Sequence, residues 1–400
     1  MKLIFFDLHE SWLNLLPVTF TRYSAEIRLG IDTIADKWAA ALPQCVSGGY
    51  VGEEYMSEAC EADDGPVADE ESLYIAGNVL PDTALTAFIA QGLWQGKWAM
   101  KAGERLVAVK GTADDWKRRD NLPVLDIPES IAVRAIDRPY DIFSYNGEFI
   151  KKDFGRLVTG KVFTSVNSTN TVIGDASLIY VAPGAEVNGA ILNTMHGPIW
   201  IGTEAHVMEG ACLRGPIAIG DHSSVNMGAK IYPDTTLGPW CKVGGELNNV
   251  VMQGYSNKAH DGFLGNAVIG EWCNLGAGCT ASNLKNDYTP VKLWNYRTRR
   301  FEKTGLQFCG LVMGDHSKAG INTMFNTGTV VGVGCNIHGT GFPRNFIPSF
   351  SEGGAAGFTD VQLPKFFDTA SRVMARRGRD LDARSRLLFE SIFDFADTFK

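Results

Sequence analysis

The chain has 400 residues, of which 45% are hydrophobic and 20% are charged, and its formal net charge is -8. This length favours two or more domains, because a single core rarely organises more than about 200 residues. The composition excludes a mainly disordered chain, and the acidic balance without a recurring basic block argues against nucleic acid as a partner. No run approaches the roughly 18 apolar residues of a membrane span, so we expect no membrane partner.

The start of the chain and its cysteines indicate the compartment. The apolar residues 3–6 are followed at once by Asp7, which predicts a first buried strand and not a signal peptide. None of the eight cysteines belongs to a Cys-x-x-Cys pair, a spacing that zinc and thioredoxin-like sites use. We therefore expect reduced thiols in a cytoplasmic protein.

Residues 1–158 alternate between two kinds of pattern. Short apolar runs at 3–6, 73–76 and 106–109 predict strands, and the stretches 31–42 and 83–91 predict helices. This alternation favours an amino-terminal α/β domain with a mostly parallel sheet.

Three basic residues, Arg22, Arg28 and Lys37, lie before and within the first long helical stretch of this domain. Phosphate is favoured at the positive end of a helix dipole and by arginine side chains. The sequence therefore predicts a nucleotide or phosphate site there.

From residue 201 an aliphatic residue stands at every sixth position. The series is Ile201, Val207, Leu213, Ile219, Val225, Ile231, Leu237 and Val243. It resumes at Ile269 and Leu275 and again at Met313, Ala319, Phe325, Val331 and Ile337. A small residue usually follows four positions later, and four of these positions are cysteines, which favours a structural role for their thiols.

One coil cannot bury its own inward residue, but stacked coils align such residues into a continuous interior column. The pattern resembles the hexapeptide-repeat family of left-handed parallel β-helices, and that resemblance supplies the handedness. We predict a β-helix domain over 159–342 and a carboxy-terminal extension with helices over 343–400. Such β-helices host acyltransferases, γ-class carbonic anhydrases and purely structural prisms, so the fold alone does not define a function.

A histidine stands where the period breaks, in Ser256-Asn-Lys-Ala-His260-Asp-Gly-Phe263-Leu-Gly265. Asn274, Ala277 and Asn283 follow it. This set resembles the acetyltransferase half of the bifunctional N-acetylglucosamine-1-phosphate uridylyltransferase and glucosamine-1-phosphate N-acetyltransferase. The resemblance implies that His260 is the general base, that Asn274 holds the amino sugar, and that Asn283 lies near acetyl-CoA. Imidazole suits this role because it titrates near neutral pH.

The chain departs from that family where cations bind the sugar phosphate. Asn248 and Tyr232 stand at the positions of a family lysine and a family arginine, and Phe263 replaces a tyrosine. Either other cations replace them or the acceptor differs. The candidate cations are Lys258, Lys285, Lys292 and Arg297. The insert 282–309, rich in basic and aromatic residues, is either a lid or a contact with a neighbouring subunit.

The amino-terminal region resembles the shortened sugar nucleotidylyltransferase domain of an alternative, Bacteroidetes-type form of the same bifunctional family. The resemblance runs through both domains and into the tail, including Pro343-Arg-Asn-Phe-Ile-Pro348. It implies Mg²⁺ for nucleotidyl transfer, with Asn78, Asp82 and Asn146 as candidate ligands. So few carboxylates would leave the ion dependent on substrate phosphates.

The resulting hypothesis is a bifunctional transferase that acetylates an amino-sugar 1-phosphate and joins the product to UTP, giving UDP-N-acetylglucosamine. Its implied partners are a sugar phosphate, UTP and acetyl-CoA, and its implied assembly is a homotrimer. Three alternatives remain. They are nucleotidyl transfer alone with the β-helix as an oligomerising scaffold, a non-catalytic sugar-nucleotide sensor, and a zinc γ-carbonic anhydrase. The last is disfavoured because the histidines lack the close pair that such a site uses, so we expect no zinc.

Overall fold

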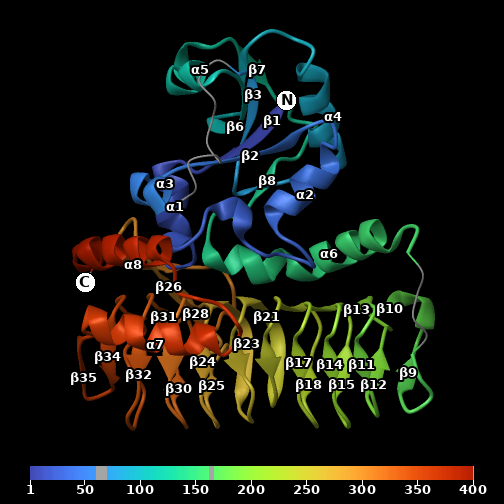
Figure 1. Cartoon of the computed structure of the whole chain (residues 1–400), viewed down its shortest axis with the longest axis vertical. Coiled ribbons are helices and arrows are strands. Elements are labelled where there is room, and N and C mark those ends of the chain that lie inside the picture. Colours follow the sequence, from blue (N-terminus) through green and yellow to red (C-terminus); the bar gives the residue numbers. More distant parts are fainter. Residues whose placement is uncertain (60–69, 162–165, 400) are drawn as a thin grey trace. The chain divides into compact units, whose positions relative to one another are not determined.

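The structure, a computed structural model, describes residues 1–59, 70–161 and 166–399 (Figure 1). The contacts between residues divide the chain into two compact units. The first contains Met1–Leu15, Thr21–Ile27 and Asp32–Asp137, and the second contains Leu16–Phe20, Arg28–Ile31 and Arg138–Lys400. This division falls before the boundary predicted at residue 158, because the intervening helix packs on the second unit.

The first unit is built on one twisted α/β sheet. Among the described residues its strand order is β2-β1-β3-β6-β5-β7, with β1 parallel to β2 and β3, and β6 antiparallel to β3 and β5. The strands are β1 (Lys2–Phe6), β2 (Val46–Val51), β3 (Ser72–Ala76), β5 (Trp98–Ala102), β6 (Arg105–Gly111) and β7 (Val124–Asp126). A separate short pair joins β4 (Val79–Leu80) to β8 (Arg134–Ala135).

The helices of the first unit begin at recognisable caps. Thr33 accepts a hydrogen bond from Asp36 N at the start of α2 (Ile34–Ala41), and Asp82 accepts one from Ala84 N at the start of α4 (Thr83–Gly92). Such caps satisfy amide groups that the helix itself leaves without partners. The remaining helices are α1 (His9–Leu15), α3 (Glu54–Ala59) and α5 (Ala113–Lys117).

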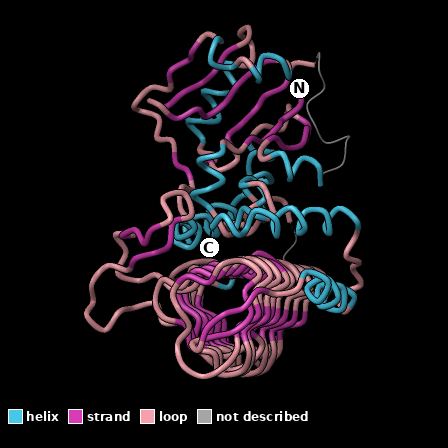
Figure 2. The backbone as a smooth tube through the Cα atoms, turned by 90° about the vertical axis from the view of Figure 1, so that its left-hand side faces the viewer, coloured by secondary structure: helices cyan, strands magenta, loops and turns pink. Residues whose placement is uncertain are grey.

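The second unit is a parallel β-helix, as the repeat predicts, and it is left-handed, as the resemblance implies. Each coil contributes short strands to three sides that we call faces A, B and C, and the coils overlap in the view along the axis (Figure 2). Face A contains β10 (Ile179–Val181), β13 (Ile199–Ile201), β16 (Ile217–Ile219), β19 (Thr235–Leu237), the second halves of β21 (Glu246–Gly254) and β23 (Phe263–Glu271), β28 (Val312–Met313), β31 (Val330–Val331) and β33 (Phe346–Ile347).

Faces B and C complete the coils. Face B contains β11 (Glu186–Val187), β14 (His206–Val207), β17 (Ser224–Val225), β20 (Lys242–Val243), β22 (Asn257–Lys258), β24 (Asn274–Leu275), β29 (Lys318–Ala319), β32 (Asn336–Ile337), β34 (Ser351–Gly354) and β35 (Gly357–Asp360). Face C contains β9 (Thr171–Ile173), β12 (Ile191–Asn193), β15 (Cys212–Arg214), β18 (Lys230–Ile231), the first halves of β21 and β23, β25 (Thr280–Ala281) and β30 (Met324–Phe325).

The inward side chains of the three faces form three columns, and the aliphatic residues of the period-six pattern occupy them. Ile201, Ile219 and Leu237 are stacked on face A, and Leu213 and Ile231 on face C. On face B, Val207, Val225 and Val243 are followed by Lys258, whose side chain is fully buried. Lys258 is therefore a charged residue in an otherwise apolar column of face B.

A long helix, α6 (Pro139–Val158), lies along face A of the β-helix (Figure 1). Asn146 anchors it, because its Nδ2 donates to Asp234 O at 2.7 Å and its Oδ1 accepts from Gly30 N at 2.7 Å and from Thr236 Oγ1 at 3.1 Å. Asp153 Oδ2 accepts a hydrogen bond from Ile31 N at 2.9 Å. The helix thus holds residues 28–31 against the β-helix.

Two additions decorate the β-helix. The insert folds into an antiparallel hairpin of β26 (Lys292–Asn295) and β27 (Arg300–Lys303), and the tail forms α7 (Leu363–Ala375) and α8 (Ala383–Ala396). Within the described ranges, no helix is both long and apolar enough to cross a membrane.

Candidate functional site

His260 lies exposed at the corner between faces B and C, just after β22 and just before β23. The next coil places Ala277 and Gly278 beside it, since Gly278 N donates to Asp261 O at 3.0 Å. An exposed imidazole next to backbone N–H groups of a stacked coil is open to a substrate on the surface of the β-helix.

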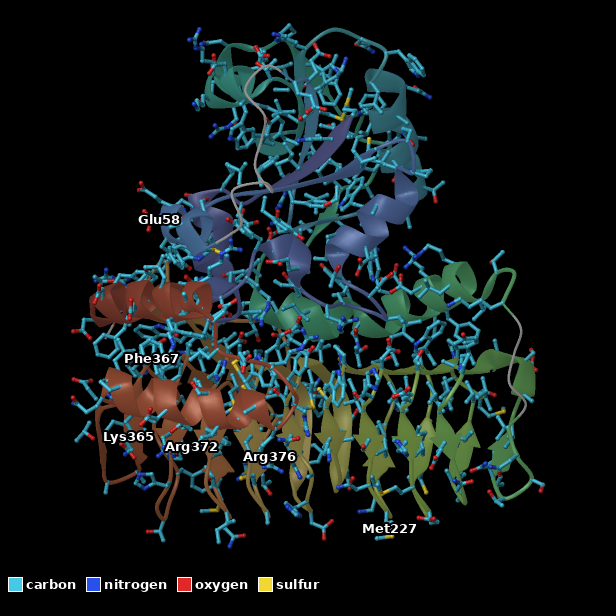
Figure 3. All side chains as sticks on the ribbon, viewed as in Figure 1. Glu58, Met227, Lys365, Phe367, Arg372 and Arg376 are labelled. Atoms are coloured by element: carbon cyan, nitrogen blue, oxygen red, sulfur yellow. The ribbon has the colours of Figure 1, made fainter. Side chains whose placement is uncertain are left out.

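Asn274 lies on face B, one coil beyond Asn257, with which it pairs in the parallel ladder. Asn257 is three residues before His260, so both asparagines lie on the same side of the His260 corner. Arg377, just beyond α7, donates from Nη2 to Asn257 Oδ1 at 3.2 Å. Burial and the charge of Arg376, whose position at the end of α7 is labelled in Figure 3, lower the pKa of Arg377.

Phe263, Asn248 and Asn283 lie on or beside face C, on the other side of the same corner. Asn248 is paired with Gly265 in the ladder, and Phe263 with Glu246. Asn283 Nδ2 donates to Asn266 Oδ1 at 2.8 Å at the far corner of that face. These strand pairings place five of the predicted residues on consecutive coils around one corner: His260, Asn274, Ala277, Phe263 and Asn248.

Lys258 does not face this surface. Its side chain fills the inward position between Val243 and Leu275, and its Nζ donates to Gly244 O at 3.5 Å and to His260 O. Burial lowers the pKa of its ammonium group. Lys258 therefore supports the backbone of His260 from inside and is not placed to bind a sugar phosphate. The period-six pattern did not reveal that Lys258 points inward, because the spacing from Val243 to Lys258 is not a multiple of six.

Lys292, at the start of β26, lines a separate hollow together with Lys285. Arg297 lies in the turn of the same hairpin. The exposed cations of the insert are therefore grouped around the hairpin.

The basic residues predicted for the amino-terminal site divide between the two units. Arg22 and Lys37 belong to the first unit, whereas Arg28 belongs to the second. Lys37 forms a buried ion pair with Asp32 and donates to Asp32 O at 3.1 Å. Arg28 Nη1 donates to Ile31 O at 2.6 Å, and its backbone exchanges hydrogen bonds with the Gln253 side chain.

The candidate magnesium ligands are used in other ways. Asn78 Nδ2 donates to Ile136 O and Asp137 Oδ1, both at 3.2 Å, and Asp82 caps α4. Asn146 belongs to the second unit, where both its amide atoms have backbone partners. Among the described residues, no group of three His, Cys, Asp or Glu side chains is arranged to hold a metal ion. These three residues do not fit a common Mg²⁺ site.

Asp7 is an ionisable residue of the first unit that the motif analysis missed. It follows β1 and accepts hydrogen bonds from Ser24 N at 2.8 Å and from Ser24 Oγ. Gly77, at the end of the neighbouring β3, leaves room for this contact, since a side chain there would lie 2.6 Å from Ser24 Oγ. Burial raises the pKa of Asp7 to about 6. Polar groups at the carboxyl ends of parallel strands, with a shifted pKa, are typical of a functional site.

Glu26 lies near both Asp7 and Arg22. Arg22 is buried, and its charge opposes the rise that burial causes in the pKa of Glu26. The signal available in the sequence was the position of Asp7 directly after the first strand. Ser24 and Glu26, which lie near Asp7, come from the segment after the first helix, and only folding brings that segment to the end of β1.

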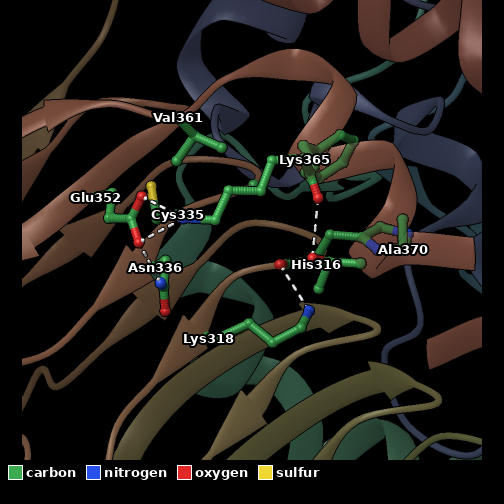
Figure 4. Close-up of a pocket in the computed structure, with 11 residues that line it drawn as sticks. His316, Lys318, Cys335, Asn336, Glu352, Val361, Lys365 and Ala370 are labelled. Atoms are coloured by element: carbon green, nitrogen blue, oxygen red, sulfur yellow. Dashed lines mark hydrogen bonds and ion pairs between the residues drawn. The ribbon is translucent and has the colours of Figure 1, made fainter. Parts of the chain in front are cut away.

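A small cavity between α7 and face B contains a different set of polar residues (Figure 4). Glu352 accepts hydrogen bonds from Asn336 at 2.9 Å and from Lys365 at 3.1 Å. Lys318 Nζ donates to His316 O at 2.9 Å and to Trp272 O at 3.1 Å, and burial lowers its pKa to about 8. These groups satisfy one another, so the cavity joins the tail to the β-helix.

Comparison with known proteins gives two findings. Residues 3–162 match the family model for sugar nucleotidyl transferases. The bifunctional protein GlmU of Methanocaldococcus jannaschii is 34% identical over 111 residues, which is 27% of this chain and 26% of that protein.

Longer but weaker similarities point the same way. The bifunctional protein GlmU of Paenarthrobacter aurescens is 27% identical over 247 residues, covering 58% of this chain and 45% of that protein. The bifunctional sugar-1-phosphate nucleotidylyltransferase/acetyltransferase of Sulfurisphaera tokodaii is 25% identical over 219 residues, covering 54% of this chain and 51% of that protein. The chain thus spans about a quarter to a half of the length of these curated relatives.

Proposed function

We propose that the β-helix unit transfers the acetyl group of acetyl-CoA to the amine of glucosamine 1-phosphate, and that the first unit couples the product to UTP. The products are UDP-N-acetylglucosamine, coenzyme A and pyrophosphate. The observation that carries the acetyl half is the exposed His260 with Asn274 and Ala277 on the next coil. The match of residues 3–162 to sugar nucleotidyl transferases supports the other half.

In the acetyl half, the amine nitrogen attacks the thioester carbon and forms a tetrahedral intermediate. His260 accepts the proton that the amine loses, and backbone N–H groups of the adjacent coil stabilise the oxyanion. When the carbon–sulfur bond breaks, the thiolate takes a proton from the imidazolium and leaves as coenzyme A. Asn274 orients the sugar from face B. This step needs no metal ion from the protein.

In the nucleotidyl half, an oxygen of the sugar 1-phosphate attacks the α-phosphorus of UTP, and pyrophosphate leaves. Positive side chains stabilise the charge on the phosphates in such a transition state. Arg22, near Glu26, is the basic residue of this region that the arrangement favours. Mg²⁺ commonly neutralises nucleotide phosphates in this chemistry, but Asn78, Asp82 and Asn146 do not fit a common site for it.

We expect His260→Ala to lower the rate of thiol release from acetyl-CoA with glucosamine 1-phosphate by about 100- to 10,000-fold, since a positioned general base contributes about that much. The assay is thiol release followed with a chromogenic disulfide, alongside pyrophosphate release from UTP and N-acetylglucosamine 1-phosphate. Nucleotidyl transfer should not change, because His260 belongs to the second unit.

The matched control is His206→Gln, which alters an outward histidine on face B in an earlier coil. It should retain the wild-type rate of thiol release. Wild-type protein that releases no thiol with any amino-sugar phosphate would contradict acetyl transfer. Nucleotidyl transfer alone, with the β-helix as a scaffold, is favoured in that event by the uncharged Asn248 and Tyr232 on face C.

The assembly we propose is a homotrimer, in which neighbouring β-helices flank the His260 corner. A location in the cytoplasm agrees with the seven free cysteines among the described residues.

A further inference from the structure

The hairpin of β26 and β27 lines a hollow that the acetyl-transfer residues do not use. Its volume is about 660 Å³, and Lys285, Lys292, Trp294, Phe301, Arg344 and Phe346 are among its lining residues. The lining contains three cations and no carboxylate. A hollow of this size with a few charged groups and aromatic walls is typical of a small-molecule site.

The cations of this hollow have few acidic partners. Arg344 lies over the Phe358 ring at 5.1 Å, and Lys285 Nζ donates to Thr289 Oγ1 at 2.6 Å. Across the described ranges, no acidic side chain forms an ion pair with Lys292 or Arg344. Lys285 pairs with Asp287 at 3.5 Å, but Asp287 is itself largely exposed and lies outside the lining. Three like charges in one hollow favour a ligand with two or more phosphate groups.

The aromatic wall is rigid. Trp294 is stacked on Phe346 with their ring centroids 4.3 Å apart and an angle of 14° between the rings, and Phe301 meets Trp294 edge-on at 5.2 Å. Phe301 remains 42% exposed. An exposed aromatic ring held by packed neighbours offers a surface on which a planar base can stack.

The hairpin is also fixed to the β-helix. Gly328 N donates to Cys309 O at 3.0 Å, and the φ of Gly328 is +64°. A side chain at residue 328 would lie 2.3 Å from Lys292 O, so only glycine permits this approach. Asn345 Nδ2 donates to Thr327 O at 2.8 Å and closes the wall on the opposite side. The backbone that carries Lys292 is therefore held in place, which reduces the entropic cost of binding.

The position of the hollow relates it to the His260 corner. Along face B the coils follow in the order Lys258, Leu275, Ala319 and Ile337, and Asn345 belongs to the coil of Ile337. With coils about 4.8 Å apart, the far end of the hollow lies about 14 Å from the His260 coil along the axis. The hollow lies at the corner between faces C and A, so the width of face C also separates it from His260. A ligand that reaches both places must carry its reactive group on a long arm.

We propose that this hollow binds the adenosine 3′-phosphate 5′-diphosphate end of coenzyme A. The adenine stacks on Phe301 and Trp294, and Lys285, Lys292 and Arg344 bind the phosphates. The pantetheine arm then extends toward the coil of His260. This inference rests on the proposed acetyl transfer, because it names the donor site of that reaction.

The test is equilibrium binding of adenosine 3′,5′-bisphosphate, followed by tryptophan fluorescence and by calorimetry. Arg344→Gln and Lys292→Gln should each raise the Kd about 10- to 100-fold, since each removes a charged hydrogen bond to phosphate. Lys303→Gln, which removes a hairpin cation outside the lining, should leave the Kd unchanged. Trp294→Phe should reduce the fluorescence change on binding while calorimetry still detects the ligand.

Kinetic measurements connect the hollow to the reaction. Arg344→Gln should raise the KM for acetyl-CoA by the same factor and leave the KM for glucosamine 1-phosphate unchanged. Dephospho-coenzyme A, which lacks the 3′-phosphate, should bind more weakly than coenzyme A to wild-type protein. In the variant that lacks the cation binding the 3′-phosphate, the two ligands should bind equally tightly. Thermal unfolding of each variant confirms that it is folded.

Three outcomes would overturn the assignment. They are an unchanged Kd in both Arg344→Gln and Lys292→Gln, tighter binding of UDP-N-acetylglucosamine than of adenosine 3′,5′-bisphosphate at this hollow, or failure of the bisphosphate to compete with acetyl-CoA. If wild-type protein binds the bisphosphate through Arg344 but releases no thiol with any amino sugar, the proposed acetyl transfer fails and the nucleotide site stands. If thiol is released and Arg344→Gln changes neither the Kd nor the KM for acetyl-CoA, the assignment of the hollow is wrong and the proposed acetyl transfer stands.

Discussion

At the scale of single residues, Asp7 shows how burial and function oppose each other. Its carboxylate is held by Ser24 in a place that raises its pKa to about 6, which is costly for a charged group. Active sites often carry this kind of local instability. The nearby Glu26 strengthens this interpretation.

The raised pKa makes a prediction about pH. Because the folded state binds the Asp7 proton more tightly than the unfolded state does, this residue contributes stability at low pH that is lost as the pH rises from about 4 to about 6. The difference of about two pKa units corresponds to about 3 kcal/mol. Asp7→Asn removes this dependence, so its unfolding free energy relative to wild type should increase between about pH 4 and about pH 7.5.

The measurement is denaturant unfolding of both proteins at each pH. Comparing the two cancels the titration of all other carboxylates. Pyrophosphate release by Asp7→Asn should fall at the same time. Parallel stability curves for the two proteins would show that Asp7 does not titrate in this range.

At the scale of elements, the short strand β22 joins the core of the β-helix to its candidate site. Its outward Asn257 lies in the ladder beside Asn274, and its inward Lys258 supports the carbonyl group of His260. A buried ammonium group in an aliphatic column is costly unless its hydrogen bonds compensate. Burial of Lys258 thus lowers the stability of the core, and its hydrogen bond fixes the backbone at His260.

We expect Lys258→Met to change the unfolding free energy by no more than about 1 kcal/mol, because relief of desolvation offsets the lost hydrogen bonds. The kcat for thiol release should fall about 10-fold, because the backbone that carries His260 loses its anchor. Leu275→Met, a change of similar volume in the same column one coil further on, is the matched control and should keep the wild-type kcat. A wild-type kcat in Lys258→Met would show that the ammonium group does not position His260.

At the scale of the whole molecule, the proposed homotrimer predicts a mass in solution of three times the 43.6 kDa chain. Closed cyclic assembly allows each His260 corner to face a neighbouring β-helix. Sedimentation or light scattering at several protein concentrations tests this directly. A mass that stays at that of one chain, together with full thiol release, would place the complete acetyl site within a single β-helix.

The amino-acid sequence by itself determined the architecture of the β-helix. The aliphatic residues from 201 to 243 are spaced evenly, and the structure places all of them in the three inward columns, because stacking of local coils repeats one geometry. His260, Asn274 and Ala277 came from the resemblance to the acetyltransferase family, and the structure places them on adjacent coils because their separation along the chain is short. The division into an α/β region followed by a β-helix also follows from local periodicity.

Only the tertiary structure decided the orientation and the partners of the charged residues. Coils of irregular length turned Lys258 into the core, and the packing of the tail carried Arg377 to Asn257. The hollow needed the hairpin at 292–303 and Arg344 to meet, and Asp7 needed Ser24 and Gly77. The period of a repeat is written into neighbouring residues, whereas charges become a site or a structural pair through contacts between segments that the sequence does not bring together.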